Sequence, residues 1–274
     1  AIFNQTSDNR LYVRNTQISE LFQTYNAFLN YDRTFSSHHV KVMTGMIAEK
    51  SHYQRLYGYR ENMIVDELDD INLGDPTTAE NSGGSHEEGL ISYLGRFNYD
   101  HEGTFLIEGL FRRDGSSRFS PENRWANFYG ISGGIRLSEF TFVQNWNVFD
   151  HLKLRASYGE TGSQTGIAYY DYISSISSGV TVFGYTGEKH PTSWISSMTS
   201  EDRTWERVAT TNLGIDFTVL NNRLSGVVEL FNRANTGMLI SVTYPQTLGA
   251  SAPKTNSGNF TARGWETQLN WRDN

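Results

Sequence analysis

One short run in the chain has the spacing of a catalytic serine motif. Residues 130–134 read GISGG, which fits the G-x-S-x-G pattern that presents a nucleophilic serine in some hydrolases. That motif needs a sharp turn between a strand and a helix, whereas Ser132 falls in the middle of an alternating, strand-like run. We therefore assign no catalytic residue and expect the glycines to permit close packing or curvature.

Carboxylates and histidines offer a second kind of chemistry, which is metal binding. The run DELDDINLGD (66–75) and the later His86–Glu88 collect acidic side chains, but they lack the alternating ligand spacing of an EF-hand loop. His38 and His39 sit at a predicted short turn, and we interpret them as surface residues. We predict no metal site and no cofactor, with calcium on the acidic surface loop as the alternative.

Two further groups of side chains lie in predicted loops. Asp114 and Arg118 in RRDGSSRF are spaced to pair across the base of a loop, as a structural clamp. Five aromatic residues in the longest loop are candidates for substrate contact, because sugar rings stack on flat aromatic faces and Tyr and Trp are enriched at interfaces. The alternative is that they pack the loop itself. These residues are Tyr169, Tyr170, Tyr172, Tyr185 and Trp194.

The composition excludes several functional classes. The chain has 274 residues, of which 37% are hydrophobic, and no apolar run approaches the roughly 18 residues of a transmembrane helix. Cysteine is absent, so there are no disulfides, thiol nucleophiles or cysteine-ligated metals. The formal net charge is −7 and no basic block stands out, which argues against nucleic-acid binding.

The elements that must position these residues are strands. In HLKLRASYG (151–159), Leu152, Leu154 and Tyr158 alternate with charged or polar residues, which is the period of a strand. Leu213, Ile215 and Phe217 alternate in the same way. The run 104–113 does not resolve into two faces. We predict about ten strands, near residues 2–7, 20–31, 38–50, 90–100, 104–113, 126–138, 151–159, 206–219, 223–233 and 260–271.

The connections between these strands alternate between short and long. Tight turns are predicted at 32–37, 101–103 and 220–222, and a somewhat longer one with a helical turn at 137–150. Long polar connections are predicted at 51–89, 114–125, 160–205 and 234–259. Long structureless loops are uncommon in compact soluble domains, whereas outer-membrane barrels combine short periplasmic turns with long extracellular loops. The pattern therefore favours an all-β, antiparallel transmembrane β-barrel over a soluble sandwich.

In that barrel the apolar sides of the strands would face lipid. We predict lipid contact for Leu152, Leu154, Tyr158, Leu213, Ile215 and Phe217. Aromatic residues near the outer strand ends would form an interfacial girdle. These are Tyr93, Tyr158, Trp205 and Trp265. The chain begins without a signal peptide and ends just after a strand, so both ends are expected to be cut from something longer.

Several runs, in this order, resemble the SusC/RagA-type TonB-dependent transporters of the Gram-negative outer membrane. The segment YLGRFNYDHEGTFLIEGLFRRDGSSRF (93–119) is similar to a barrel hairpin of that family, and residues 152–172 resemble its next strand and loop entry. Residues 204–239 resemble its Trp-Glu plus asparagine-led hairpin, and residues 256–272 its N-x-G…G-x-E strand. Residues 60–74 resemble the segment that precedes its acidic loop.

The resemblance implies a barrel of 22 strands plugged by an N-terminal domain. It implies import of oligosaccharides or peptides with energy passed by TonB, and a SusD-like surface lipoprotein as a lid, which the aromatic loop residues could also touch. Residues 1–274 would then be part of the barrel, without the plug domain and TonB box. The alternatives are a passive porin-like barrel, a soluble β-rich adhesin or binding module, and an outer-membrane hydrolase that uses Ser132.

Overall fold

The computed structural model describes residues 11–65, 67–182, 187–195, 198–242 and 253–273. The chain divides into two compact units. The first comprises residues 1–25 and 49–89, and the second comprises residues 26–48 and 90–274.

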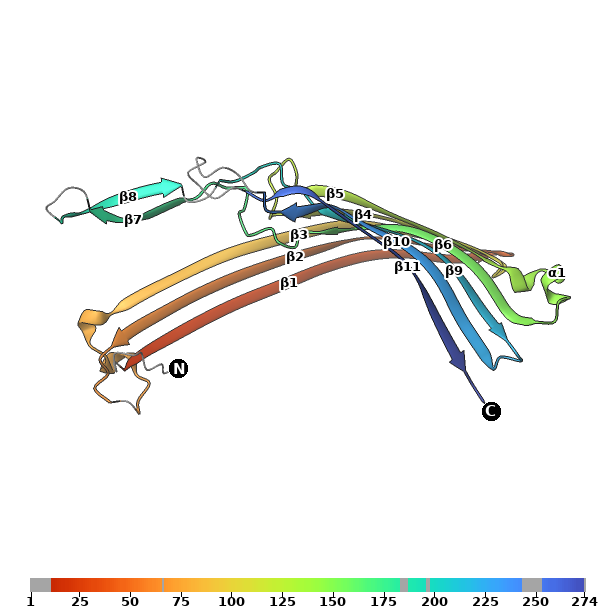
Figure 1. Cartoon of the computed structure of the whole chain (residues 1–274), viewed down its shortest axis with the longest axis horizontal. Coiled ribbons are helices and arrows are strands. Elements are labelled where there is room, and N and C mark those ends of the chain that lie inside the picture. Colours follow the sequence, from red (N-terminus) through yellow and green to blue (C-terminus); the bar gives the residue numbers. More distant parts are fainter. Residues whose placement is uncertain (1–10, 66, 183–186, 196–197, 243–252, 274) are drawn as a thin grey trace. The chain divides into compact units, whose positions relative to one another are not determined.

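Nine strands form one antiparallel sheet, in the order β1-β2-β3-β4-β5-β6-β9-β10-β11 (Figure 1). Every strand predicted from residue 20 onward is confirmed by one of these nine, and the one predicted at 2–7 lies outside the described residues. The bounds are β1 Tyr12–Phe35, β2 His38–Glu61, β3 Glu80–His101, β4 Phe105–Ser116, β5 Trp125–Arg136, β6 Phe149–Ser163, β9 Glu206–Val219, β10 Leu224–Ile240 and β11 Thr255–Trp271.

Several strands are longer than the sequence predicts, so the predicted loops at 51–89 and 234–259 are partly wrong. The strand β2 continues to Glu61 and β3 begins at Glu80, and both are far longer than the roughly 9–11 residues that cross a bilayer. Their outer parts are polar on both faces, so they lack the apolar alternation by which a strand is recognised. Cross-strand pairs hold them instead. In the first unit, Glu87 binds His52 at 3.0 Å and Lys50 at 3.4 Å.

The predicted long loop 160–205 contains a two-stranded sheet that the sequence analysis missed. It consists of β7 Ile176–Val182 and β8 Lys189–Ile195, paired antiparallel. Ser and Gly in ISSGVTV and Pro191 in KHPTSWI weaken the strand signal, because these residues are depleted in strands or typical of turns. Cross-strand pairing overrides that weak local preference.

The predicted short turns are confirmed, and they require left-handed backbone at their centres. Ser36, Glu102 and Asn221 have φ values of 53°, 51° and 55°. The longer connection between β5 and β6 contains the 3-10 helix η3 Leu137–Glu139 and the short helix α1 Thr141–Gln144, as expected. In the described part of the chain, no helix is long and apolar enough to span a membrane.

The acidic run in the first unit uses its carboxylates locally. Asp70 accepts a hydrogen bond from the backbone N–H of Asn72 at 2.9 Å and begins the 3-10 helix η1 Ile71–Leu73. Asp75 accepts from the backbone N–H of Thr77 at 2.8 Å and begins η2 Pro76–Thr78. Hydrogen bonds from Thr77 lower the pKa of the Asp75 carboxyl. Among the residues that the structure describes, no three acidic or histidine side chains are grouped to hold a metal ion.

Candidate functional site

The register of the second unit sorts its side chains into two faces. One row of paired residues crosses seven strands, from β3 to β11, and contains no charged side chain. It consists of Tyr99, Ile107, Gly133, Ala156, Leu213, Leu230 and Trp265. Directly paired residues point to the same side of a sheet, and neighbours along a strand point to opposite sides. We call the side of this row the apolar face.

The next row toward the short turns points to the other side, which we call the polar face. It consists of Asp100, Leu106, Gly134, Arg155, Gly214, Glu229 and Glu266. The register also resolves β4, which the sequence left open. Phe105, Ile107 and Phe111 lie on the apolar face, while Leu106 and Leu110 share the polar face with Glu108.

The side chains predicted to contact lipid lie on the apolar face. Leu154, Tyr158, Leu213 and Ile215 are exposed in this chain, whereas Leu152, nearest the turn to α1, is buried. Ser132, in the middle of β5, belongs to the polar face because it pairs with Glu108 and Ser157. The strand–turn–helix setting of a nucleophilic serine is therefore not present at Ser132.

A hollow of about 810 Å³ lies over the polar face, lined mainly by residues of β3–β6. Its charges are largely arranged in pairs. The carboxylate of Glu108 binds Arg96 at 2.8 Å and accepts a hydrogen bond from the side-chain amide of Asn98 at 2.5 Å. Arg155 binds Asp216 at 3.1 Å and Glu229 at 2.5 Å, so its guanidinium ties three strands together. The result is a hydrophilic wall with many hydrogen-bonding groups.

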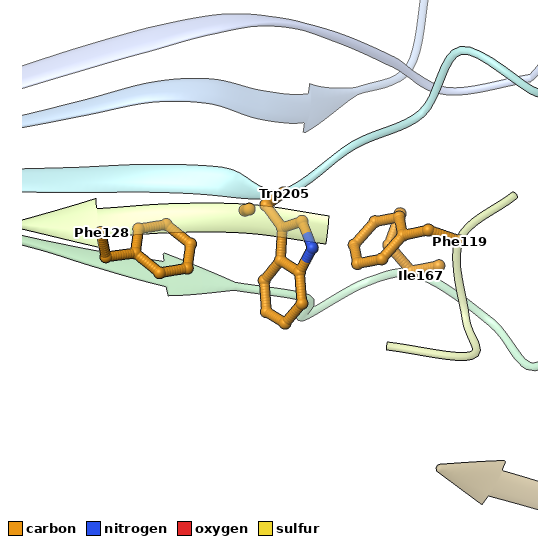
Figure 2. Packing of buried hydrophobic residues seen from close by; sticks show 5 residues of the cluster. Phe119, Phe128, Ile167 and Trp205 are labelled. Atoms are coloured by element: carbon orange, nitrogen blue, oxygen red, sulfur yellow. The ribbon is translucent and has the colours of Figure 1, made fainter. Parts of the chain in front are cut away.

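At the other end of the strands, a small apolar cluster lies beneath the long connections (Figure 2). Trp205 is 6% exposed, and its ring lies between Phe128 and Phe119, at centroid distances of 5.9 Å and 5.1 Å. Ala126 and Ile167 complete the cluster. Phe119 comes from the 114–125 connection, Ile167 follows β6, and Trp205 precedes β9. We call this cluster, with the hydrogen bonds around it, the loop platform.

Side chains tie these connections to main-chain atoms. Trp205 Nε1 donates to the carbonyl of Arg124 at 3.0 Å. Ser120 Oγ and Asn123 Nδ2 both donate to the carbonyl of Glu201, at 2.9 Å and 2.8 Å. Asn256 Nδ2 donates to the carbonyls of Thr204 and Gly237 at 2.9 Å and 2.7 Å, and its Oδ1 accepts from the N–H of Thr204 at 3.0 Å.

Charged groups complete the platform. Glu206 accepts a hydrogen bond from the backbone N–H of Leu239 at 2.9 Å, which joins the end of the 160–205 connection to the end of β10, where the chain leads into the connection to β11. Arg203 forms an ion pair with Asp171 within the 160–205 connection. Burial lowers the pKa of the Arg203 guanidinium.

Of the two predicted clamp residues, Arg118 contacts this platform and Asp114 lies within β4. The buried carboxylate of Asp114 accepts two hydrogen bonds from Arg112 Nε, at 2.6 Å and 2.8 Å. Arg118 donates to the carbonyl of Ile167 at 2.8 Å and lies 4.4 Å from the ring centroid of Tyr169. Arg118 thus joins the 114–125 connection to the one that follows β6, whereas Asp114 binds a neighbour within β4, and the pairing of Asp114 with Arg118 as a clamp stays a prediction.

The four described aromatic residues among the five predicted to contact substrate have different surroundings. Tyr169 packs under Arg118, and Tyr172 lines a second hollow of about 480 Å³ beside Ser120. Tyr170 is exposed, with a φ of 58°. Trp194 is exposed on β8, beside Gly179 of β7. Tyr185 lies outside the described residues.

One predicted girdle residue is placed wrongly by the sequence analysis. Trp205 belongs to the platform cluster and is buried, so it does not face lipid. Tyr93, Tyr158 and Trp265 are exposed on the apolar face. The ring of Tyr93 stacks against Trp125, and the guanidinium of Arg113 lies 5.2 Å from the ring centroid of Trp125.

Sequence reasoning missed the polar residues that tie the platform. Asn256, Asn123 and Ser120 read as ordinary loop residues, because their partners are carbonyl groups about 80 or 50 positions away. Gln164, which accepts from Ser116 Oγ at 2.5 Å, was missed for the same reason. The sequence offered one signal for these residues: each lies within or close to a run on which the family resemblance rests.

Comparison with known proteins agrees with this geometry. The chain is 30% identical over 254 residues to the TonB-dependent receptor SusC of Bacteroides thetaiotaomicron, covering 90% of this chain and 24% of that protein. It is 31% identical over 258 residues to the TonB-dependent receptor P39 of Formosa agariphila, covering 90% of this chain and 23% of that protein. The chain therefore spans about a quarter of the length of these relatives. No family model matches it.

Solved structures show the same fold. The chain superposes on the RagAB peptide transporter with a TM-score of 0.85 at 24% identity, covering 96% of this chain and 29% of the other. It also matches the ferric-catecholate import receptor Fiu from K12 E. coli, with a TM-score of 0.53 at 12% identity and coverage of 93% and 36%. An antiparallel sheet with one apolar and one polar face, matched to these structures, is part of the β-barrel of a TonB-dependent receptor. Within that class, the chain belongs to the SusC/RagA-type family.

Proposed function

We propose that this chain forms part of the wall of an energy-coupled importer in the outer membrane of a Gram-negative bacterium. The single observation that carries the proposal is the two-faced sheet, whose uncharged row alternates with a row rich in charge. A barrel places such an apolar face against lipid and such a polar face toward an aqueous interior. In this protein the chain supplies wall and surface loops, and the transported molecule is not chemically altered.

Hydrophilic oligosaccharides or peptides are the cargo that this wall suits. The paired charges of Arg96, Glu108 and Arg155 offer hydrogen bonds without a large net charge that would hold one ion tightly. Among the matched structures, RagAB is named as a peptide transporter. The exposed rings of Tyr170 and Trp194 are the aromatic candidates for contact with cargo at the loop side.

A SusD-like lipoprotein is the proposed partner on the side of the long loops. One face of the β7–β8 hairpin presents Ile176, Val180 and Ile195, all exposed in this chain. An exposed apolar patch of this kind is typical of an interaction surface. Energy from TonB is proposed for the whole transporter.

Uptake by the full-length protein in its native host tests the proposal. Cells are supplied with labelled peptides and oligosaccharides, with the gene intact, deleted, or intact in a strain that lacks TonB. We expect uptake of at least one cargo class to be lost in both the gene deletion and the TonB deletion. Uptake that needs the gene but not TonB would indicate a passive pore, and unchanged uptake in the gene deletion would overturn the transport function.

A further inference from the structure

The connection between β5 and β6 begins with Leu137, Ser138 and the exposed Glu139, and it continues as an aromatic run without charge. Residues 140–149 read FTFVQNWNVF and contain no Asp, Glu, Lys or Arg. The other short turns of the second unit, at 36–37, 102–104 and 220–223, are small and polar or mixed in character. We call residues 140–149 the aromatic turn. Figure 1 shows it, with α1, where β5 leads into β6.

The aromatic turn lies on the apolar side of the sheet. Ring contacts run without interruption from β4 to β6, with centroid distances of 6.1 Å for Phe105–Phe140, 5.8 Å for Phe140–Phe142, 6.0 Å for Phe142–Trp146 and 6.3 Å for Trp146–Phe149. Both ends of this series are on the apolar face. Phe105 pairs with Ile135, and Phe149 pairs with Val219.

The turn is ordered by its own hydrogen bonds, yet its largest side chains are left uncovered. Val143 is 1% exposed and points inward, whereas Phe142 and Trp146 are 57% and 56% exposed. The N–H of Trp146 donates to the carbonyl of Val143 at 3.0 Å, and Gln144 Nε2 donates to the carbonyl of Ser138 at 3.1 Å. A well-formed turn that holds two aromatic rings outward is suited to an apolar surrounding.

Hydrogen bonds of Arg136 and Asp150, on either side of the connection that holds the aromatic turn, lead to the neighbouring short turns. Asp150 Oδ2 accepts from the backbone N–H of Asn222 at 2.8 Å, and the N–H of Arg136 donates to the carbonyl of Thr104 at 2.9 Å. The aromatic turn is therefore at the short-turn end of the strands. In outer-membrane barrels that end is periplasmic, and aromatic side chains concentrate where hydrocarbon meets the lipid head groups.

We propose that the aromatic turn is a membrane anchor that inserts Phe142 and Trp146 into the periplasmic, phospholipid leaflet. The inference rests on the proposed function, because it requires the apolar face to meet lipid. Phospholipid is the occupant, since the ring series continues the apolar face without a gap and the turn offers no charged group to a polar partner. The anchor fixes the depth at which β5 and β6 sit in the bilayer.

A spin label at position 142 tests this placement in the full-length protein reconstituted into phospholipid vesicles. Phe142→Cys carries the label, and its collision rates with oxygen and with a water-soluble nickel chelate report its depth. Asn221→Cys, in a polar short turn, is the matched aqueous control, and Leu213→Cys, on the apolar face, is the matched lipid control. Val148→Cys, also exposed on the turn, is the second variant if Phe142→Cys does not fold.

We expect the ratio of oxygen to nickel collisions at position 142 to exceed that at position 221 several-fold and to approach that at position 213. A water-like ratio at 142 and 148 with a lipid-like ratio at 213 would overturn the anchor and leave the barrel orientation standing. A water-like ratio at 213 as well would overturn the proposed function itself. An immobilised label shielded from both reagents would show that protein, not lipid, covers the turn.

Discussion

Single polar side chains carry much of the connection between distant loops in this protein. Asn256 satisfies three main-chain groups of Thr204 and Gly237, and a buried hydrogen bond is worth roughly 0.5–1.5 kcal/mol net. At the same scale, Trp205 supplies both a ring for the cluster and a donor for Arg124. In the loop platform, side-chain hydrogen bonds thus hold together connections that are not joined by the backbone hydrogen bonds of a sheet.

Replacing Asn256 with alanine should loosen the platform. The change leaves the Thr204 and Gly237 groups without these bonds, and we expect a loss of about 1–3 kcal/mol in stability with faster protease cleavage in the 160–205 connection. Asn259→Ala is the matched control, because Asn259 is exposed and accepts one bond, from the N–H of Gly237, at 3.4 Å. Limited proteolysis of the detergent-purified protein is the measurement, and equal cleavage of both variants would contradict the prediction.

Gly162 illustrates a close approach that only glycine permits. A Cβ at this position would lie 2.2 Å from Phe128 Cζ, within the platform cluster. Gly162→Ala should therefore displace Phe128 and lower stability by about 1–3 kcal/mol, as overpacking does. At Gly159 in the same strand a Cβ would meet nothing within 4 Å, so Gly159→Ala should be close to neutral. Thermal unfolding in detergent compares them, and similar melting temperatures would refute the packing argument.

At the scale of elements, the alternation of apolar and polar residues predicts the strands that have one apolar face. It does not predict the strands whose two faces are both polar or mixed. Residues 151–159 and 206–219 were predicted closely because Leu152, Leu154 and Ile215 mark one face. The outer half of β2 and the hairpin β7–β8 were not, because both of their faces are polar or mixed. Pairing with a strand far away in the sequence forms these strands, as the contact between His52 and Glu87 illustrates for β2 and β3, and no local pattern records such pairing.

The candidate site, like the strands, could be predicted from the sequence only in part. The polar face could be predicted, since alternation fixes which side Ser132 and Arg155 occupy. The burial of Trp205 could not, because its partners Phe119 and Phe128 come from other connections. A tryptophan at a strand end has the same sequence signature whether it meets lipid or a loop.

Adjacent cysteines in β5 test the two faces directly. Ser132→Cys places a thiol on the polar face, and Ile131→Cys places one on the apolar face, at neighbouring positions of one strand. In the full-length protein in membranes, we expect a water-soluble thiol reagent to label position 132 and a lipid-soluble reagent to label position 131. The reverse pattern would show that the faces are assigned the wrong way round.

For the whole molecule, the proposed function means that one sheet separates two media. Apolar side chains on β4–β6 and β9–β11 remain exposed in quantity, while the small buried cluster sits beneath the loops. Under the proposed function we therefore expect the stability of the assembled protein to depend on the surrounding bilayer more than on an internal core. This is the reverse of a soluble sandwich.

Introducing a charge on the apolar face should oppose membrane assembly. Ile215→Arg places a guanidinium where lipid is expected, at a cost of roughly 2–4 kcal/mol near the bilayer midplane. Asn212→Arg, on the polar face of the same strand, is the matched control. We expect the level of folded protein in isolated outer membranes to fall for Ile215→Arg and to hold for Asn212→Arg. Equal levels would count against lipid contact at Ile215.

The acceptors used by the loop platform have an evolutionary consequence. Ser120, Asn123, Asn256, Trp205 and Arg118 all donate to peptide carbonyls, those of Glu201, Thr204, Gly237, Arg124 and Ile167. Every amino acid carries such a carbonyl. Descendants of this gene are thus free to change the exposed side chain at position 201 without losing the bonds that Ser120 and Asn123 donate to its carbonyl, while the same few donors continue to hold the loops.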